Sequence, residues 1–474
     1  MFARVLLVLV FVFVSCVQSF DSRNVVFIII SQKEPYLASV AFRLKQEIEG
    51  QVFRIERRNP IVHLTHEDFP VPGAWSIIPL LKPLVTKYRG GDVRWVMFLE
   101  EHTAVRCEKL LEALAAADRQ KDTKWIGYPL SDDEPTIIHH FAMYEELEEE
   151  GGFVYPNFAS GFAMRMELIE TLLNQIESGQ HKLEADFSID PGFELAQLVY
   201  GDRHTPGPLL TADLSFCIVS GDNCATYPRQ FETCGSPIPE ESIFFAVKTW
   251  SGFHSSRAKV VKRTWGRHVT NLMFFSDQAD PSLPAVDTGV PNTKTGHCAK
   301  TVAILKEAVS RVRNMPHVKW IFLADDDTIL GVQRLCEILS CYRGGTDITV
   351  IGERYGYGYV NKETAAKGYD YITGGGGTAF SIAAASLLSR CVCTALTSPD
   401  DMTLGACAKE RAVPLTHYPL FHQARPQDYP REVLSRDRPL SFHRHSSPEP
   451  YKVYATWFQH DDLALKHRYS KDEL

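Results

Sequence analysis

The sequence predicts an α/β protein of two tandem domains, each with a mostly parallel sheet flanked by helices. The chain has 474 residues, more than most single domains contain. Apolar runs typical of buried strands alternate with helix-like segments, which favours a parallel sheet between helices. Four landmarks also occur twice in the same order, and such a repeat indicates two copies of one architecture.

The first two landmarks are a strand with its helix and a strand that ends in acidic residues. NVVFIII near Asn24 and SIFFAVK from Ser242 each begin an apolar strand that leads through a polar turn to a helix-like segment. WVMFLEEHT from Trp95 aligns with WIFLADDDT from Trp320, with Glu-Glu-His in place of Asp-Asp-Asp. Ligands of parallel sheets bind outside the carboxyl ends of the strands, where both acidic triplets are expected.

The other two landmarks follow in each half of the chain. NFASGFAM from Asn157 corresponds to TGGGGTAF from Thr373, and SIDPGFELA from Ser188 corresponds to SPDDMTLGA from Ser398. A run of turn-forming residues between positions 228 and 242 predicts the boundary. We therefore expect one domain over residues 20–235 and a second over residues 236–470.

Composition and charge exclude some classes of protein. Hydrophobic residues make up 45% of the chain and charged residues 23%, which is ordinary for a globular protein. The formal net charge is -8, whereas a general nucleic-acid binder usually carries a basic excess. We therefore expect no nucleic-acid partner.

The two ends of the chain predict a location in the secretory pathway. Residues 1–19 combine Arg4 with the apolar run Val5–Val14 and small residues, as in a cleaved secretory signal. An uncleaved anchor is the alternative, but the run is shorter than the ~20 residues that span a bilayer. The last four residues, KDEL, are the address that the KDEL receptor reads for retrieval to the endoplasmic reticulum. We expect a soluble protein of that lumen, without stable insertion in a membrane.

The cysteines predict disulfides. Of 11 cysteines, Cys16 leaves with the signal, and the ten that remain allow up to five disulfides in an oxidising compartment. Cys336 and Cys341 are close enough to join at a helix end. Cys391 and Cys393 are too close to pair with each other, and Cys407 is a candidate partner. Sequence alone leaves the other pairings open, and no spacing predicts a zinc site.

Asp325, Asp326 and Asp327 predict a metal site. Three consecutive acids after a buried strand repel one another unless a cation compensates them. Alternate residues of an extended chain point the same way, so Asp325 and Asp327 can share a face. Carboxylates suit Mg²⁺ or Mn²⁺, which in turn hold a diphosphate. The alternative is a solvated acidic turn.

Two further motifs in the second half suggest chemistry. The glycines of TGGGG, Gly375 and Gly376 among them, would let the backbone approach a ligand closely. Asp400 and Asp401 precede a helix, and a carboxylate there could accept a proton from an attacking hydroxyl. The alternative for this pair is a helix N-cap, for which aspartate is well suited.

Taken in order, FFAVKTW, WIFLADDDT, YITGGGGTAFS, SPDDMTLG and PLFHQA resemble the Fringe-like β-1,3-glycosyltransferases over residues 242–460. The resemblance implies a GT-A (Rossmann-like) fold, an inverting reaction and a divalent metal. It implies Asp325 and Asp327 as metal ligands, with Asp327 the expected direct ligand, and Asp401 as the base. We also expect Asp326, Gly375 and Gly376 at the donor.

The third metal ligand departs from the family pattern. Fringe enzymes carry His-x-His after PLF, and the second histidine binds the metal. This chain has His422 at the first position and Ala424 at the second. We therefore expect His422 as the third ligand, with His443 or His445 as alternatives.

Tandem halves together with an ER-retrieval signal resemble the family members that extend O-linked fucose on thrombospondin type 1 repeats. This resemblance implies UDP-glucose as donor, Mn²⁺ or Mg²⁺ as cofactor and O-fucosylated repeats as acceptor. Asp401 would deprotonate the fucose hydroxyl, which displaces UDP in one inverting step. Alternatives are another UDP-sugar or acceptor, a non-catalytic lectin or chaperone, and a hydrolase with paired carboxylates.

The first half lacks the same residues. Glu100, Glu101 and His102 stand in place of the aspartates, and Pro191 follows Asp190 at the position of the acidic pair. We predict that this half has lost catalysis and either recognises the protein acceptor or supports its partner domain.

Overall fold

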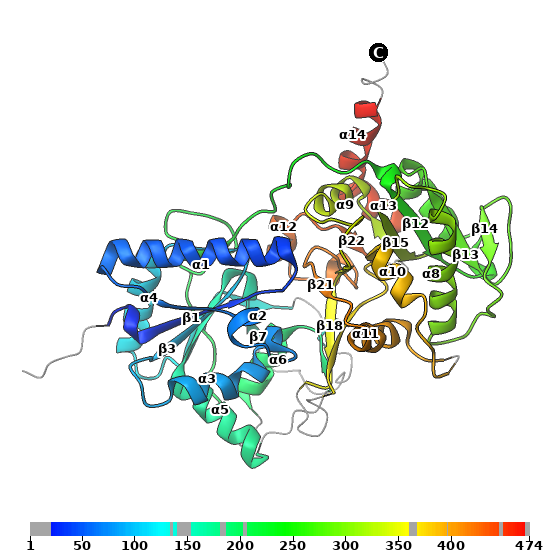
Figure 1. The fold of residues 1–474 in the computed structure, drawn as a ribbon. Coiled ribbons are helices and arrows are strands. Elements are labelled where there is room, and N and C mark those ends of the chain that lie inside the picture. The colour runs from blue at the N-terminus through cyan, green and yellow to red at the C-terminus, as the bar shows by residue number, and fades with distance from the viewer. Residues whose placement is uncertain are drawn as a thin grey trace, which may run out of the picture.

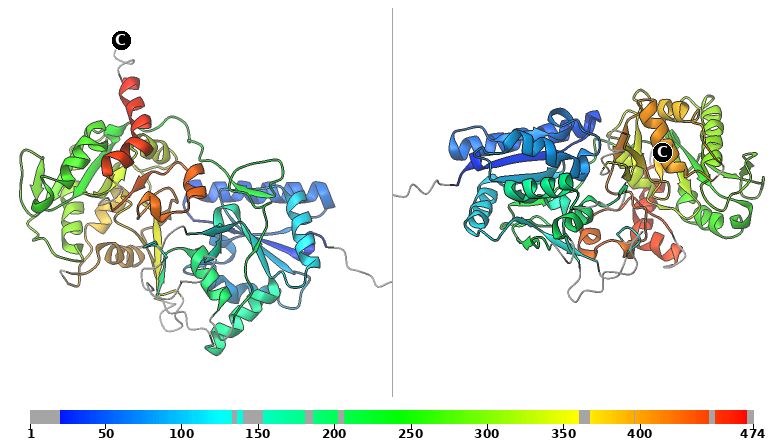
Figure 2. Two further views of the ribbon diagram at one scale, coloured as in Figure 1. Left: turned by 180° about the vertical axis from the view of Figure 1, so that it is seen from behind. Right: turned by 90° about the horizontal axis from the view of Figure 1, so that it is seen from below.

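The computed structural model describes residues 20–132, 136–139, 153–180, 186–201, 206–359, 367–395, 397–444 and 449–469. The expected signal, the KDEL segment and His445 lie outside these residues. Two sheets with helices on their faces lie side by side, one from each half of the chain (Figures 1 and 2). No helix in the described part of the chain is long and apolar enough to cross a membrane.

Within the described residues, the first sheet has six strands in the order β10-β5-β8-β3-β1-β2. Its strands are β1 (Val25–Ile30), β2 (Ile61–Leu64), β3 (Trp95–Glu100), β5 (Trp125–Gly127), β8 (Phe162–Arg165) and β10 (Thr211–Ala212). Neighbouring strands run parallel except at β8, which is antiparallel to both β3 and β5.

The second sheet has seven strands in the part of the chain that the structure describes, in the order β14-β13-β12-β15-β20-β17-β21. Its strands are β12 (Ile243–Lys248), β13 (Leu272–Ser276), β14 (Ala285–Asp287), β15 (Trp320–Asp325), β17 (Val350–Gly352), β20 (Thr378–Ser381) and β21 (Leu415–His417). Here β20 is the antiparallel strand, in the place that β8 has in the first sheet. The predicted α/β class with mostly parallel sheets is confirmed.

Helices cover both faces of each sheet, which is why the strands are apolar at consecutive positions rather than at alternate ones. The first half contains α1 (Pro35–Glu56), α2 (Thr65–Asp68), α3 (Leu81–Tyr88), α4 (Cys107–Arg119), α5 (Met166–Ser178) and α6 (Pro191–Tyr200). The second contains α7 (Arg257–Arg263), α8 (Cys298–Val312), α9 (Val332–Leu339), α10 (Ile382–Leu388), α11 (Asp400–Glu410), α12 (Arg431–Arg436), α13 (Pro450–Trp457) and α14 (Gln459–Tyr469). In β12, for example, Phe245 packs in one core with α7 and α9, and Phe244 packs in the other with α8 and α10.

The two halves repeat one another in local detail. Thr103 Oγ1 donates to Ala159 O at 3.0 Å, and Thr328 Oγ1 donates to Gly375 O at 2.8 Å. Gly161 and Gly377 both have positive φ, 74° and 87°. The landmarks of the sequence thus occupy equivalent places, while the domain boundary between residues 235 and 236 stays a prediction.

Shorter strands complete the fold. They are β4 (Thr103–Val105) with β11 (Thr226–Pro228), β6 (Pro129–Ser131) with β7 (Val154–Pro156), β16 (Ile329–Leu330) with β22 (Ser441–Phe442), and β19 (Tyr369–Ile372), β18 (Arg354–Tyr357) and β9 (Phe187–Ser188) in one sheet. This last sheet contains strands of both halves, because β9 of the first half pairs with β18 of the second. The two halves are therefore joined by backbone hydrogen bonds.

The structure corrects the expected Cys336–Cys341 disulfide and confirms the pairing of Cys391 with Cys407. All ten cysteines after residue 19 are described, and eight of them form the disulfides Cys217–Cys224, Cys234–Cys341, Cys298–Cys393 and Cys391–Cys407. The expected Cys336–Cys341 bond is wrong. Cys336 lies on the buried face of α9 and is a free thiol in the core, as Cys107 is in the first half. Cys341 follows the helix and instead fixes Cys234, in the segment between the two sheets.

Candidate active site

The site lies at the carboxyl ends of β12 and β15. These strands are parallel neighbours, and their register places Lys248 opposite Asp325. Parallel strands present the groups that follow them at one edge of the sheet, where ligands of such sheets bind. Thr328 fixes the turn after β15, because its Oγ1 accepts from Asp325 N at 3.1 Å while it donates to Gly375 O.

Asp325, Asp327 and His443 form a three-residue cluster that could hold a metal ion. One ligand atom from each lies within 4.8 Å of the others. His443 Nε2 is 3.1 Å from Asp327 Oδ1 and 3.9 Å from Asp325 Oδ2. Two carboxylates and an imidazole are a donor set that fits a divalent cation. Because His443 Nδ1 faces Gln423 O at 2.9 Å, this nitrogen donates there and Nε2 can bind the metal through its lone pair.

The histidine in this cluster is His443 and not His422. His422 Nδ1 is 2.9 Å from Leu420 O, and its ring packs edge-on against Tyr429 with centroids 4.4 Å apart. Burial lowers the pKa of His422 to about 4, so the ring is neutral and structural. We therefore move the third-ligand assignment from His422 to the alternative His443.

Asp326 points to a different partner from its neighbours. Its Oδ2 accepts from Thr249 Oγ1 at 2.7 Å, and burial raises the pKa of its carboxyl to about 6. Arg257 Nη1 lies 2.7 Å from Asp327 Oδ2 and 3.4 Å from Asp326 Oδ1. Asp325 and Asp327 thus lie together as expected, although residues 326 and 327 form a turn instead of an extended chain. Arg257 bridges Asp326 and Asp327.

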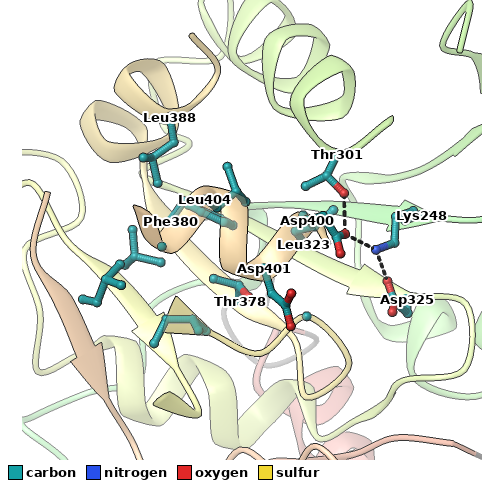
Figure 3. A pocket seen from close by; sticks show the side chains of 15 residues that line it. Lys248, Thr301, Leu323, Asp325, Thr378, Phe380, Leu388, Asp400, Asp401 and Leu404 are labelled. Carbon is teal, nitrogen blue, oxygen red and sulfur yellow. Dashed lines mark hydrogen bonds and ion pairs between the residues drawn. The ribbon is translucent and has the colours of Figure 1, made fainter. Parts of the chain in front are cut away.

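Lys248 links the cluster of Asp325, Asp327 and His443 to the acidic pair, Asp400 and Asp401, on α11. Its Nζ lies 3.0 Å from Asp325 Oδ1 and 2.6 Å from Asp400 Oδ2, and Thr301 Oγ1 donates to the same Asp400 oxygen at 2.7 Å (Figure 3). Burial opposes the charge on Lys248, but Asp325 and Asp400 outweigh it and raise its pKa. Sequence reasoning missed this lysine, although a charged residue at the end of the apolar run FFAVK is a signal for it.

Asp401 differs from Asp400 in its surroundings. Figure 3 shows its carboxylate pointing away from the pair formed by Lys248 and Asp400. One oxygen, Oδ1, accepts from Met402 N at 2.7 Å. Burial and the neighbouring Asp400 raise the pKa of Asp401 to about 6. Asp400 is thus engaged as the counter-ion of a lysine, whereas the carboxylate of Asp401 points away from that ion pair and binds a proton more readily.

Two cavities meet at this edge. The larger, of about 240 Å³, is lined by Lys248, Thr249, Trp250, Phe253, Arg257, Asn292, His297, Lys300, Asp325, Asp326, Asp327 and His443. Its cationic and aromatic side chains beside the metal cluster suit an anionic ligand with an aromatic ring. The smaller cavity, of about 30 Å³, contains Asp400 and Asp401 and shares Lys248 and Asp325 with the larger one.

The glycine run contacts protein side chains more than open space. A Cβ on Gly375 would lie 2.3 Å from the ring of His443, so this glycine makes room for the metal histidine. Gly376 N donates to Gln423 Oε1 at 3.1 Å. Gly374 lines the smaller cavity, and a Cβ there would meet nothing within 4 Å. Gly375 and Gly376, expected at the donor, therefore shape the site from behind, and Gly374 is the glycine that faces the cavity.

The first half has a different arrangement at the equivalent edge. The register of β1 and β3 places Ile30 opposite Glu100, where the second sheet has Lys248 opposite Asp325. Asp190 caps α6 and lies 2.8 Å from His139 Nε2. Within the described ranges, the cluster of Asp325, Asp327 and His443 is the only potential metal site.

The comparisons with known proteins agree with this geometry. A family model described as Fringe-like matches residues 238–462. Mouse β-1,3-glucosyltransferase is 40% identical over 441 residues, 92% of this chain and 87% of the mouse protein. The human β-1,3-glucosyltransferase is 40% identical over 446 residues, 93% of this chain and 86% of the human protein. Human lunatic fringe, a β-1,3-N-acetylglucosaminyltransferase, is 30% identical over 119 residues, 24% of this chain and 31% of that protein.

Fold, site and similarity together define a glycosyltransferase. The chain belongs to the Fringe-like family, in the group that contains the mouse and human β-1,3-glucosyltransferases.

Proposed function

We propose that this protein transfers glucose from UDP-glucose to O-linked fucose on thrombospondin type 1 repeats, with inversion at the anomeric carbon. One observation carries the proposal: the cluster of Asp325, Asp327 and His443 borders the larger cavity and connects through Lys248 to the acidic pair that contains Asp401. The names of the near full-length relatives support the β-1,3-linked glucose. The acceptor and the lumenal location come from the sequence resemblance and the KDEL terminus.

The residues of the cavity divide the work on the donor. Asp325, Asp327 and His443 would hold Mn²⁺ or Mg²⁺, which when bound would neutralise the charge on the diphosphate leaving group. Arg257 and Lys300 line the same cavity and add positive charge to it. A cavity that places charge in advance stabilises the leaving group without reorganising at the moment of reaction.

The acidic pair divides the work on the acceptor. Asp401 takes the proton from the attacking fucose hydroxyl, and proton transfer of this kind contributes about 10²–10⁴-fold to a rate. Asp400 holds Lys248, and Lys248 holds Asp325, so the base and the metal cluster keep a fixed separation. A single displacement follows, and it needs no nucleophile from the protein.

The test is a donor and acceptor screen with the purified full-length protein. UDP-glucose, UDP-galactose and UDP-N-acetylglucosamine are each offered with a fucosylated and an unfucosylated thrombospondin repeat, with Mn²⁺ or with a chelator. We expect glucose transfer to the fucosylated repeat alone, dependent on metal, with a β-1,3 linkage by NMR.

The same screen separates the alternatives. Transfer of another sugar would overturn the donor assignment. Consumption of UDP-glucose at the same rate without acceptor would indicate a hydrolase, and tight binding of the fucosylated repeat without turnover would indicate a lectin.

A further inference from the structure

The carboxyl edge of the first sheet, where that half would bind a ligand, contacts the second half instead. Gln32 lies two residues after β1. Its Nε2 donates to His417 O at 3.1 Å and to Glu101 Oε1 at 3.0 Å, and its Oε1 accepts from His417 N at 2.8 Å. The side chain of Gln32 in the first half therefore hydrogen-bonds both the N–H and the carbonyl of His417, the last residue of β21.

The side chain of His417 in turn contacts the first residue of β18, Arg354. Its Nδ1 accepts from Arg354 N at 3.2 Å. The guanidinium of Arg354 lies over the ring of Trp75 from the first half, 4.5 Å from its centroid, and Trp75 Nε1 donates to Asp370 Oδ1 at 2.8 Å. The start of β18 and the neighbouring strand β19 are thus held against the first half by hydrogen bonds and by stacking.

Glu353 precedes Arg354 and contacts Gln423, the residue whose backbone oxygen faces His443. Its Oε2 accepts from Gln423 N at 2.5 Å, and its backbone oxygen accepts from Thr373 N at 2.9 Å. Gln423 O in turn accepts from His443 Nδ1, and Gln423 Oε1 accepts from Gly376 N. A continuous set of contacts therefore runs from Gln32 to the histidine of the metal cluster.

His443 depends on such support. It follows β22, a strand of two residues, and its ring lies against Gly375, which has no side chain to hold it. The partner of the second ring nitrogen fixes the orientation of a ligating histidine, and loss of such a partner typically weakens metal binding 10–100-fold.

We propose that Gln32 and Glu353 are positioning residues for His443, and that the first half sets the metal affinity of the second half through them. The proposal rests on the metal-dependent function above. It also chooses between the two roles expected for the first half, because its ligand edge is used as a support for the catalytic half.

The experiment measures Mn²⁺ affinity on the full-length protein in the presence of UDP, by the electron paramagnetic resonance signal of free Mn²⁺. Glu353→Ala removes the acceptor of Gln423 N and not the direct partner of His443, so it should weaken Mn²⁺ binding by about 10-fold, the lower end of that range. Glu353→Gln keeps an oxygen that can accept from Gln423 N and should stay within about three-fold of the wild type. Gln32→Ala acts one step further away and should weaken binding at least about three-fold.

Gln51→Ala is the matched control. Like Gln32, Gln51 hydrogen-bonds backbone through both ends of its amide: Nε2 donates to Val105 O at 2.8 Å and Oε1 accepts from Cys107 N at 2.9 Å. Both of these contacts stay within the first half. We expect unchanged Mn²⁺ affinity in this variant at a similar loss of melting temperature. Should Gln32→Ala fail to fold, Gln32→Asn, with a side chain too short for both contacts, replaces it.

The outcomes are distinct. Wild-type protein that binds no Mn²⁺ would overturn the metal assignment of the proposed function. Wild-type protein that binds Mn²⁺ with equal affinity in Gln32→Ala and Glu353→Ala would overturn the positioning role alone. Equal weakening in Gln32→Ala and Gln51→Ala would show a general loss of stability and would also overturn it.

Discussion

Lys248 offers the sharpest test of how the site is built. Lys248→Met keeps most of the volume of the side chain and removes its charge. Two carboxylates, on Asp325 and Asp400, then lose the ammonium that lies 3.0 and 2.6 Å away. Breaking a buried ion pair by removing one partner costs about 3–5 kcal/mol, because an uncompensated charge stays behind. Lys248 has only 12% of its side chain exposed, so solvent screens this loss little.

The expected loss is large enough for a thermal unfolding assay. In a domain of about 150–250 residues, 1 kcal/mol shifts the melting temperature by about 2–4 °C, so the variant should melt roughly 6–20 °C lower. Saturating Mn²⁺ should raise the melting temperature of the variant more than that of the wild type, since a cation near Asp325 replaces part of the lost charge.

Two further variants decide whether the charge is the cause. Lys82→Met removes a lysine paired with Glu177 at the surface, 73% exposed, and should change stability by at most about 0.5 kcal/mol. Lys248→Met combined with Asp400→Asn removes both charges of the closer pair and should recover part of the loss. A single variant that melts within 2 °C of the wild type, or a double variant that melts lower still, would refute this reasoning.

Three other predictions concern the metal and the base. Asp327→Ala should abolish Mn²⁺-dependent UDP binding, as measured by calorimetry. The matched variant Glu100→Ala, at the equivalent edge of the first sheet, should bind UDP normally. Unchanged UDP affinity in Asp327→Ala would contradict the metal site. Asp401→Asn should lower kcat about 10²–10⁴-fold and keep UDP-glucose binding, and full activity would mean that another group takes the proton. The raised pKa of Asp401 means that its basic form is lost as pH falls below about 6, so a plot of kcat/KM against pH should rise through that value, and a flat profile down to pH 4.5 would exclude Asp401 as the titrating base.

The pattern of residues close together in the sequence was enough to predict the buried strands and the closeness of Asp325 and Asp327. VVFIII and WIFLAD are buried strands because each is apolar at successive positions between two layers of helices. Asp325 and Asp327 lie close together as the sequence predicts, but through the turn that follows β15 and not through an extended chain. The choice of Asp401 over Asp400 came from the family resemblance, and the structure supplies a reason in the engagement of Asp400 with Lys248.

Contacts between distant segments could not be predicted in the same way. His443 reaches Asp327 because β22 pairs with β16, next to the acidic turn, and two-residue strands leave almost no signal in a sequence. Cys341 lies near Cys336 along the chain, yet the direction in which α9 faces the core decides that Cys234 is its partner. The contact of Gln32 with His417 depends on the packing of two sheets, which neither half specifies alone.

The small sheet to which both halves contribute strands has a consequence for synthesis. Ser188 in β9 pairs with Gly356 in β18, so a ribosome must add 168 residues (356 minus 188) between the two partners. At about 5–20 residues per second, β9 waits roughly 8–34 s for its partner. During that interval the nascent first half leaves the edge of β9 unpaired, and such edges can pair with other chains. Newly made chains stalled before β18 should therefore be more sensitive to added protease near residue 188 than chains released after it.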